Sequence, residues 1–375
     1  MTVVDIAKEL ISFDTSGPPA QEKPLAEWIR DFLVDLGVST ELQEVAPGRA
    51  NVVAKIGEGK GPGLMLSGHI DVVLPGGLDL WTVTDPFDPV VKDGRLYGRG
   101  ACDMKGPDAC ILQAVKELLD RDFKRQITMV FTAGEDTGGW FVTKVLEEGK
   151  VAPEEALYGV IPEPSVMRIV RSHKGSGGAR VLVKGKAAHS SRPDLGVNAI
   201  LKGADFLGEL VGLQERLNET VHPLLGSSTI KPTIINGGFK HNIIPDRCEI
   251  LLNCRLIPRH ARPEIVSGWL EDLISKLSVE DSAFEAEILE ARAKPSLEVP
   301  EDSGIVRILK NILGTEPIGA PYFTEAVNYT EAGIPTVICG SGNIDQAHTP
   351  NEYITLDQLD KGVRVLKRVV KEICL

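Results

Sequence analysis

The sequence is short of positive charge, of long apolar runs and of paired cysteines, and each shortage removes a class of function. Its 375 residues carry 41 lysines and arginines against 53 acidic residues, which gives a net charge of −12. Nucleic-acid phosphates repel such a surface, so we expect no nucleic-acid partner. No apolar stretch reaches the roughly 20 residues that a membrane-spanning helix needs, so we expect no membrane partner either.

The six cysteines form no CxxC pair. Scattered cysteines are typical of small buried side chains in a reducing compartment, and the first residues lack the basic-then-apolar order of a signal peptide. We therefore expect a cytoplasmic protein. Cys102 alone stays open for another role, because it precedes Asp103 in a loop rich in turn-forming residues.

No internal repeat interrupts the chain, and short apolar runs alternate with helical patterns through its first part. This alternation predicts an α/β fold in which helices cover both faces of a sheet. The expected helices and strands are helices at 24–36 and 106–120, and strands at 51–57, 63–68, 126–133, 156–161 and 333–340.

A different pattern begins near residue 175. Strands are expected at 177–191, 228–237, 246–258 and 283–292, with helices at 197–217 and 263–277. The order β-α-β-β-α-β is that of a ferredoxin-like unit. We therefore predict a discontinuous α/β domain formed by residues 1–175 and 290–375, with an inserted α+β domain at 176–289.

Residues with metal-binding chemistry fall at the carboxyl ends of the apolar runs of the larger domain, or in the loops beyond. They are His69, Asp71, Asp103, Glu135, Asp136, Glu163 and His348. The loops at this edge of an α/β sheet converge on one crevice, where so many carboxylates would repel each other without a cation. Two divalent ions would balance their charge, and mixed imidazole and carboxylate ligands suit zinc, cobalt, manganese or nickel better than calcium or magnesium.

Asp71 is expected to support the site and not to bind metal, because it lies two residues after His69. Its carboxylate could accept the proton on the other ring nitrogen of His69 and fix the orientation of that ring. Each of these residues, taken alone, is also typical of a helix cap or a turn. Their conjunction at successive strand ends favours the metal centre.

Two glycine-rich segments raise the alternative of nucleotide binding. The segment GRGACDMKG lacks the third spaced glycine of a dinucleotide-binding loop, and GSGGARV leads into an expected strand and not into a helix. Neither segment therefore fits a phosphate-binding loop.

Seven segments of the chain, taken in order, resemble signatures of one family of dinuclear zinc hydrolases. That family includes aminoacylases, acetylornithine deacetylase, succinyl-diaminopimelate desuccinylase, glutamate carboxypeptidase and several dipeptidases. The segments are SGHIDVV, DPFDPVVKDGRLYGRGACDMKG, TAGEDTGG, IPEPS, GKAAHSSRPDLGVNAI, NIIPDRCEILLNCR and AHTPNEYI. The resemblance implies a zinc-exopeptidase-like catalytic domain with a central mixed sheet and an inserted ferredoxin-like domain that dimerises.

The resemblance also assigns roles to the metal-binding residues. It implies that His69 and Glu163 hold one zinc ion and that Asp136 and His348 hold the other. Asp103 would bridge the two ions, with a cis peptide bond to Met104. Asp136 stands where the family usually carries a glutamate, whose side chain is one methylene longer.

In the resemblance, Glu135 is the general acid and base, and a water held between the two metal ions attacks the amide carbonyl. His189 resembles the histidine that reaches into the partner subunit's site to stabilise the oxyanion, which requires a homodimer. Asn242 and Arg255 resemble the pair that grips a substrate carboxylate.

The resemblance implies hydrolysis of an N-acyl amino acid, in the manner of acetylornithine deacetylase or succinyl-diaminopimelate desuccinylase. A dipeptidase or carboxypeptidase of the same chemistry is the alternative, because Glu325 stands where biosynthetic deacylases of the family usually place an aspartate. A metal-binding regulatory protein without catalysis is a more distant alternative, which the presence of Glu135 disfavours.

Overall fold

The computed structural model describes residues 1–57 and 61–375 and divides the chain into two compact units. Unit 1 comprises Met1–Arg171, Val299–Ile318 and Thr324–Leu375, and unit 2 comprises Ser172–Glu298 and Gly319–Phe323. The sequence pattern predicts an inserted domain at 176–289 and gives no sign that 319–323 returns to unit 2. Backbone pairing explains the difference, because Leu297 pairs with His173, and Lys174 N donates a hydrogen bond to Ala320 O.

The large sheet has the strand order β1-β2-β6-β3-β7-β17-β8-β15, with β16 beside β8. Neighbouring strands β6, β3, β7 and β17 are parallel, whereas β1, β2 and β8 pair antiparallel with their neighbours. The sheet is therefore mixed, as the resemblance implies. Its strands are β1 (Ser39–Ala46), β2 (Arg49–Ile56), β3 (Gly63–His69), β6 (Ile127–Thr132), β7 (Ala156–Pro164), β8 (Val170–His173), β15 (Leu297–Glu298), β16 (Ile318–Ala320) and β17 (Thr336–Gly340).

Helices cover both faces of this sheet, as residues Ser67 and Gly68 of β3 show. Successive strand residues point to opposite faces. Ser67 Oγ lies 2.9 Å from the hydroxyl of Tyr329 in α8, whereas Gly68 lies against Asp108 of α3. The helices of unit 1 are α1 (Val3–Ser12), α2 (Lys23–Asp35), α3 (Lys105–Lys116), α4 (Val142–Glu147), α7 (Gly304–Leu313), α8 (Ala326–Glu331) and α9 (Leu356–Cys374).

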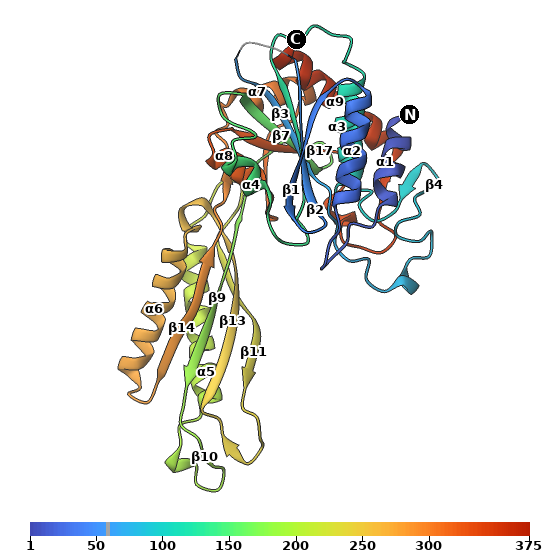
Figure 1. Cartoon of the computed structure of the whole chain (residues 1–375). Helices are drawn as coiled ribbons and strands as arrows, with labels where there is room; N and C mark the ends of the chain where they lie inside the picture. The colour runs from blue at the N-terminus through green and yellow to red at the C-terminus, as the bar shows by residue number, and fades with distance from the viewer. Residues whose placement is uncertain (58–60) are drawn as a thin grey trace. The chain divides into compact units, whose positions relative to one another are not determined.

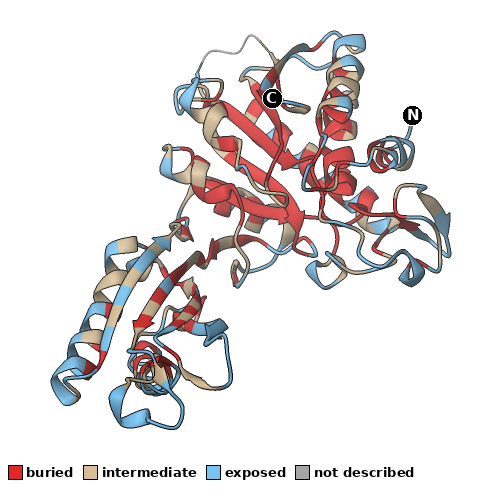
Figure 2. Cartoon of the chain, turned by 60° about the horizontal axis from the view of Figure 1, so that its bottom comes forward, coloured by how far each residue is buried: buried red, intermediate tan, exposed pale blue. Residues whose placement is uncertain are grey.

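The central strands of unit 1 are buried along their whole length, which appears as continuous red in Figure 2. The start of helix α9 is fixed by its local sequence, because Thr355 and Gln358 form a capping box there. Sequence analysis did not predict α9 or the short sheet of β4 (Val90–Lys92), β5 (Arg95–Tyr97) and β18 (Tyr353–Thr355). That short sheet joins the segment before Asp103 to the segment after His348.

Unit 2 is a ferredoxin-like unit, which confirms the prediction (Figure 1). Its sheet has the order β11-β13-β9-β14, and every neighbouring pair is antiparallel. The buried strand residues lie on one face, against helices α5 and α6. The elements are β9 (Gly175–Lys184), β10 (Ala188–His189), α5 (Ala199–Asn218), β11 (Thr229–Gly237), β12 (Ile243–Ile244), β13 (Arg247–Leu256), α6 (Pro263–Glu280) and β14 (Glu285–Ala293).

Short 3-10 helices fill several turns, namely η1 (Leu78–Leu80), η2 (Pro193–Leu195), η3 (Pro258–His260) and η4 (Ile344–Gln346). Across residues 1–57 and 61–375, none of the helices combines the length and the apolar character needed to cross a membrane.

Candidate metal centre

The carboxyl ends of the parallel strands bring the predicted ligands together. His69 is the last residue of β3, Glu163 lies near the end of β7, and Asp136 follows β6. Asp103 comes just before α3, and His348 lies in the loop after β17. Because β6, β3, β7 and β17 are neighbours and parallel, all of these side chains reach one edge of the sheet.

The ligand atoms form two groups that share Asp103, and within each group they lie within 4.8 Å of one another. The buried group consists of His69, Asp103 and Glu163, with His69 Nε2 3.2 Å from Asp103 Oδ1 and 3.6 Å from Glu163 Oε1. The open group consists of Asp103, Asp136 and His348, with His348 Nε2 3.3 Å from Asp103 Oδ2 and 3.2 Å from Asp136 Oδ1. Asp103 therefore offers one carboxylate oxygen to each group.

The turn that carries Asp103 contains the expected cis peptide bond between Asp103 and Met104. The Met104 sulfur also accepts a hydrogen bond from the backbone N–H of His69 at 3.2 Å. The turn is thus connected directly to the end of β3.

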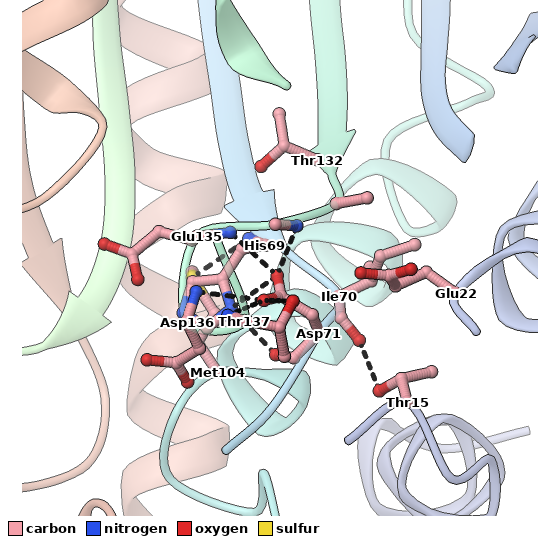
Figure 3. Close-up of polar contacts among 12 residues, drawn as sticks. Thr15, Glu22, His69, Ile70, Asp71, Met104, Thr132, Glu135, Asp136 and Thr137 are labelled. Atoms are coloured by element: carbon pink, nitrogen blue, oxygen red, sulfur yellow. Dashed lines mark hydrogen bonds and ion pairs between the residues drawn. The ribbon is translucent and has the colours of Figure 1, made fainter. Parts of the chain in front are cut away.

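Asp71 does not hold His69 in the predicted way. The Nδ1 of His69 lies 2.9 Å from the backbone carbonyl oxygen of Asp71, whereas the nearer carboxylate oxygen is 3.6 Å away. The Asp71 carboxylate instead accepts hydrogen bonds from four successive backbone N–H groups, those of Gly134, Glu135, Asp136 and Thr137, and from the Thr137 hydroxyl. Figure 3 shows these contacts converging on Asp71. Asp71 therefore fixes the loop that carries Glu135 and Asp136.

A second buried pair supports the same loop. Glu22, which is fully buried, forms an ion pair with Arg49. Arg49 also donates hydrogen bonds to the hydroxyl of Thr137 and to the carbonyl of Gly138 at 2.9 Å. The loop is consequently held from two sides, by a carboxylate and by a guanidinium.

The carboxylates of the centre are buried close together, and the nearby histidines only partly balance their negative charge. Burial raises the pKa of Glu163 well above its usual range, and the neighbouring Asp103 raises it further. Burial raises the pKa of Asp136 as well, against the hydrogen bond from His348. Burial also acts against Asp103, but hydrogen bonds from His348 and His69 outweigh it and hold the pKa of Asp103 below its usual range.

Both histidines of the centre are drawn toward the protonated form. Burial disfavours the charge on His69, but the hydrogen bond to Asp103 and the charge of Glu163 raise its pKa well above 6.5. Hydrogen bonds to Asp103 and Asp136 raise the pKa of His348 to about 10. Such shifts mark a site that attracts positive charge.

The donor set fits divalent cations. Each group supplies one imidazole and two carboxylates, which is a ligand set suited to transition metals. Within the described part of the chain, Asp136 Oδ2 is buried without a hydrogen-bond partner, which a bound cation would supply. His69, Asp103 and Glu163 can hold one ion, and Asp103, Asp136 and His348 a second.

Glu135 belongs to neither ligand group, although it precedes Asp136 in the loop held by Asp71. Burial raises its pKa well above the usual range, and the charges of Asp136 and Glu325 raise it further. Glu325 is almost fully buried and accepts a hydrogen bond from the Thr132 hydroxyl at 2.7 Å. A carboxyl group beside the ligands with a raised pKa is suited to proton transfer.

In unit 2, His189 and Asn242 lie side by side. His189 pairs with Ile243 across β10 and β12, and Ser190 N donates a hydrogen bond to the Asn242 carbonyl. Arg255 is elsewhere, because it lies eight residues beyond Arg247 along β13, a span of about 27 Å. Asn242 and Arg255 of one chain are therefore separated by most of β13, and their binding of one substrate carboxylate stays a prediction.

The sequence pattern does not predict one residue that contacts the turn of Asp103. Glu352 accepts hydrogen bonds from this turn, and Arg99 forms a buried ion pair with Glu352. The signal was present, because Glu352 lies within the quoted segment AHTPNEYI. Cys102 is fully buried, and burial raises its thiol pKa well above the usual range, so it is not a reactive thiol.

The chain is similar to known proteins over nearly its whole length. Residues 65–372 match the model of peptidase family M20/M25/M40. The chain is 35% identical to acetylornithine deacetylase from Myxococcus xanthus, over 98% of this chain and 96% of that protein.

Solved structures share the fold. Aminopeptidase PepT from Bacillus cereus is similar with a TM-score of 0.82 at 21% identity, covering 99% of this chain and 97% of that one. The YXEP protein from Bacillus subtilis, described as a dinuclear metal-binding peptidase, has a TM-score of 0.70 at 18% identity, covering 98% and 96%. The chain therefore belongs to peptidase family M20/M25/M40 and is a hydrolase of amide bonds.

Proposed function

We propose that this hydrolase removes the acyl group from an N-acyl amino acid, in the manner of acetylornithine deacetylase or succinyl-diaminopimelate desuccinylase. The observation that carries the proposal is the position of Asp103, whose two carboxylate oxygens face separate ligand groups beside Glu135. The identity to acetylornithine deacetylase, over nearly the whole of both chains, favours the acyl amino acid as the substrate.

Two divalent ions, with zinc as the expected metal and cobalt or manganese as substitutes, would be held by His69, Asp103, Asp136, Glu163 and His348. When bound, they polarise the amide carbonyl and make water acidic enough to attack at neutral pH. The mixed imidazole and carboxylate donor set supports this choice of metal.

Glu135 moves the proton in this proposal. Its carboxylate accepts a proton from the attacking water and delivers it to the leaving nitrogen, so that the acyl group departs as a carboxylate and the amino acid as an amine. Asp71 serves this step indirectly, because its carboxylate holds the Gly134–Thr137 backbone and thereby the position of Glu135.

A second copy of the chain is the proposed partner, and β11 is the proposed contact. β11 is the edge strand of the unit 2 sheet, and Ile234 and Ile235 are exposed along it. Phe239 follows with 76% of its surface exposed. An exposed apolar edge strand can pair with the same strand of another copy, which gives a two-fold symmetric homodimer.

A homodimer would also explain the separation of the residues in unit 2. His189 and Asn242 of one protomer lie together, so both would enter the active site of its partner. The Arg255 at that site would then belong to the other protomer of the dimer, not to the one that supplies His189. His189 would then stabilise the oxyanion and Arg255 would bind the substrate carboxylate. The cytoplasmic location stays a prediction.

Activity assays with defined substrates test the proposed function. The protein loaded with zinc or cobalt is offered N-acetyl and N-succinyl amino acids together with dipeptides that carry a free α-amino group. We expect turnover of an acyl amino acid and a loss of several orders of magnitude in Glu135→Gln, with metal content unchanged. Glu155→Gln, which removes a carboxylate from an ion pair with Lys55, is the control.

Two results would contradict the proposal. Cleavage of the dipeptides alone would make the protein an exopeptidase, because dipeptidases require the free amino group that deacylases exclude. Full turnover in Glu135→Gln would remove Glu135 from the reaction.

A further inference from the structure

Glu352 is a fully buried carboxylate whose two oxygens are both occupied by the segment that leads to Asp103. Its Oε1 accepts hydrogen bonds from the backbone N–H groups of Cys102 at 2.8 Å and Asp103 at 2.9 Å. Its Oε2 accepts from the N–H of Gly100 at 3.1 Å and from Arg99 Nη1 at 2.6 Å. The segment 99–103 therefore wraps around one side chain.

A left-handed glycine allows the backbone of this segment to curve around the Glu352 side chain. Gly100 has a φ of 86°, and a Cβ atom there would lie 2.9 Å from Val72 Cγ1. Glycine is the residue that adopts such a conformation without strain and fits so close a contact. The N–H groups of Gly100, Cys102 and Asp103 can then point at one anion, while that of Ala101 donates to the Gly98 carbonyl.

The placement of Glu352 follows from the short sheet. Tyr353 of β18 pairs with Tyr97 of β5, and Gly98 N donates a hydrogen bond to the Glu352 carbonyl. The side chain of Glu352 thus enters where the chain leaves β5 toward Asp103. Cys102 adds a contact, since its sulfur lies 3.2 Å from the Asn343 carbonyl.

Burying the pair of Arg99 and Glu352 is costly unless every polar atom gains a partner. Glu352 accepts hydrogen bonds from four donors, and Arg99 also lies over the Trp81 ring at 5.2 Å. Within the described residues, however, Arg99 Nε is buried without a hydrogen-bond partner, so the pair keeps part of its burial cost. Burial raises the pKa of Glu352, whereas Arg99 acts against that shift. Glu352 contacts the backbone of Asp103, the ligand shared by both groups, although burying it is costly. This combination indicates that Glu352 has a role in the metal centre.

We propose that Glu352 is a positioning residue that sets where Asp103 stands between the two ligand groups. The inference rests on the proposed function, because it assumes that Asp103 holds both metal ions. Glu352 lies four residues after His348, so one side chain connects the segment of an open-group ligand with the turn of the shared ligand. Its loss disturbs both groups at once.

The test is a metal titration of Glu352→Gln with Zn²⁺ and with Co²⁺. Glutamine keeps the size of the side chain but replaces one accepting oxygen by a donor, which opposes an N–H group or Arg99. We expect both ions to bind about 10- to 100-fold more weakly, as is usual when a residue that supports a metal ligand is lost. The visible spectrum of the Co²⁺ protein is expected to shift, because the geometry around Asp103 changes.

Two control variants separate positioning from stability alone. Leu33→Ala truncates a fully buried side chain of α2, away from the ligand segments, and lowers the melting temperature. Glu155→Gln perturbs a peripheral ion pair of unit 1. Both variants are expected to bind Zn²⁺ and Co²⁺ with wild-type affinity and to give the wild-type Co²⁺ spectrum.

Affinities within twofold of the wild type and an unchanged Co²⁺ spectrum in Glu352→Gln would overturn the inference. If Glu352→Gln does not fold, Glu352→Asp is scored by the same criteria, because it keeps the charge but retracts it by one methylene. A wild-type protein that hydrolyses acyl amino acids while Glu352→Gln binds metal normally refutes this inference alone. A wild-type protein that takes up no divalent ion refutes the proposed function.

Discussion

The buried group and the open group have the same ligand types but different surroundings. Each has one imidazole, one carboxylate of its own and a share of Asp103. The side chain of His69 is 2% exposed, whereas that of His348 is 52% exposed. His348 also lies in the left-handed region with a φ of 62°, a conformation that few residues other than glycine adopt.

This difference indicates unequal metal sites joined by one carboxylate. Water reaches the imidazole of His348, although the Asp136 side chain is only 9% exposed, so we expect an ion in the open group to be held less tightly. In the buried group, Glu163 and His69 have no such access to solvent. We therefore expect the buried group to fill first, with Asp103 coupling it to the open group.

The largest effect is expected from Asp103→Asn, because Asp103 belongs to both ligand groups and its loss removes a ligand from each. Asparagine keeps the shape of the side chain but removes the charge that both ions share. We expect the loss of both ions from dialysed protein and a fall in turnover of several orders of magnitude. Metal analysis and activity assays check this, and one ion retained at wild-type affinity would show that Asp103 is not shared.

The next effect separates the two groups through their histidines. His348→Ala is expected to keep one tightly bound ion per chain, because the buried group is intact. His69→Ala is expected to lower the affinity for the ion that binds first, because the substitution leaves Asp103 and Glu163 buried without their imidazole. Titration of each variant with Zn²⁺ measures this, and identical binding curves for the two variants would contradict unequal sites.

Metal uptake is expected to strengthen as pH rises. Metal ligation needs the neutral imidazole, whereas hydrogen bonds to Asp103 and Asp136 raise the pKa of His348 to about 10. A cation must therefore displace a proton from His348 at neutral pH, and affinity gains about tenfold per pH unit for each proton displaced. Calorimetry between pH 6 and 8 in buffers of different ionisation enthalpy checks this, and a pH-independent affinity would contradict it.

The smallest effect is expected from Asp136→Glu, which restores the residue usual in the family. Asp136 Oδ1 already reaches within 3.2 Å of His348, because Asp71 holds its loop close. The extra methylene would crowd the open group, so we expect a severalfold loss of affinity for the second ion only. A gain in affinity on Zn²⁺ titration would show that the aspartate is too short.

Much of the fold and of the ligand set could be predicted from sequence, because both depend on local patterns. The apolar runs of β3, β6, β7 and β17 stand out in the sequence, and His69, Asp136 and Glu163 lie at or just beyond the ends of three of them. The role of Asp71 could not be predicted, since its partners lie 63 to 66 residues away in the chain. Glu352 lies within the quoted segment AHTPNEYI, but its contact with Asp103 spans 249 residues, so its partner could not be predicted from the sequence.

The separation of Asn242 from Arg255 shows a further limit. Both residues belong to the one quoted segment NIIPDRCEILLNCR, but an extended strand carries its ends far apart. Only the strand geometry, with β13 paired to β9 over its whole length, shows that the two cannot meet in one chain.

Anomalous X-ray scattering at the zinc edge, from crystals of the zinc-loaded protein, tests the central claim most directly. The account predicts two peaks per chain on opposite sides of the Asp103 carboxylate, one beside His69 and Glu163, the other beside Asp136 and His348. A single peak, or peaks away from Asp103, would contradict it.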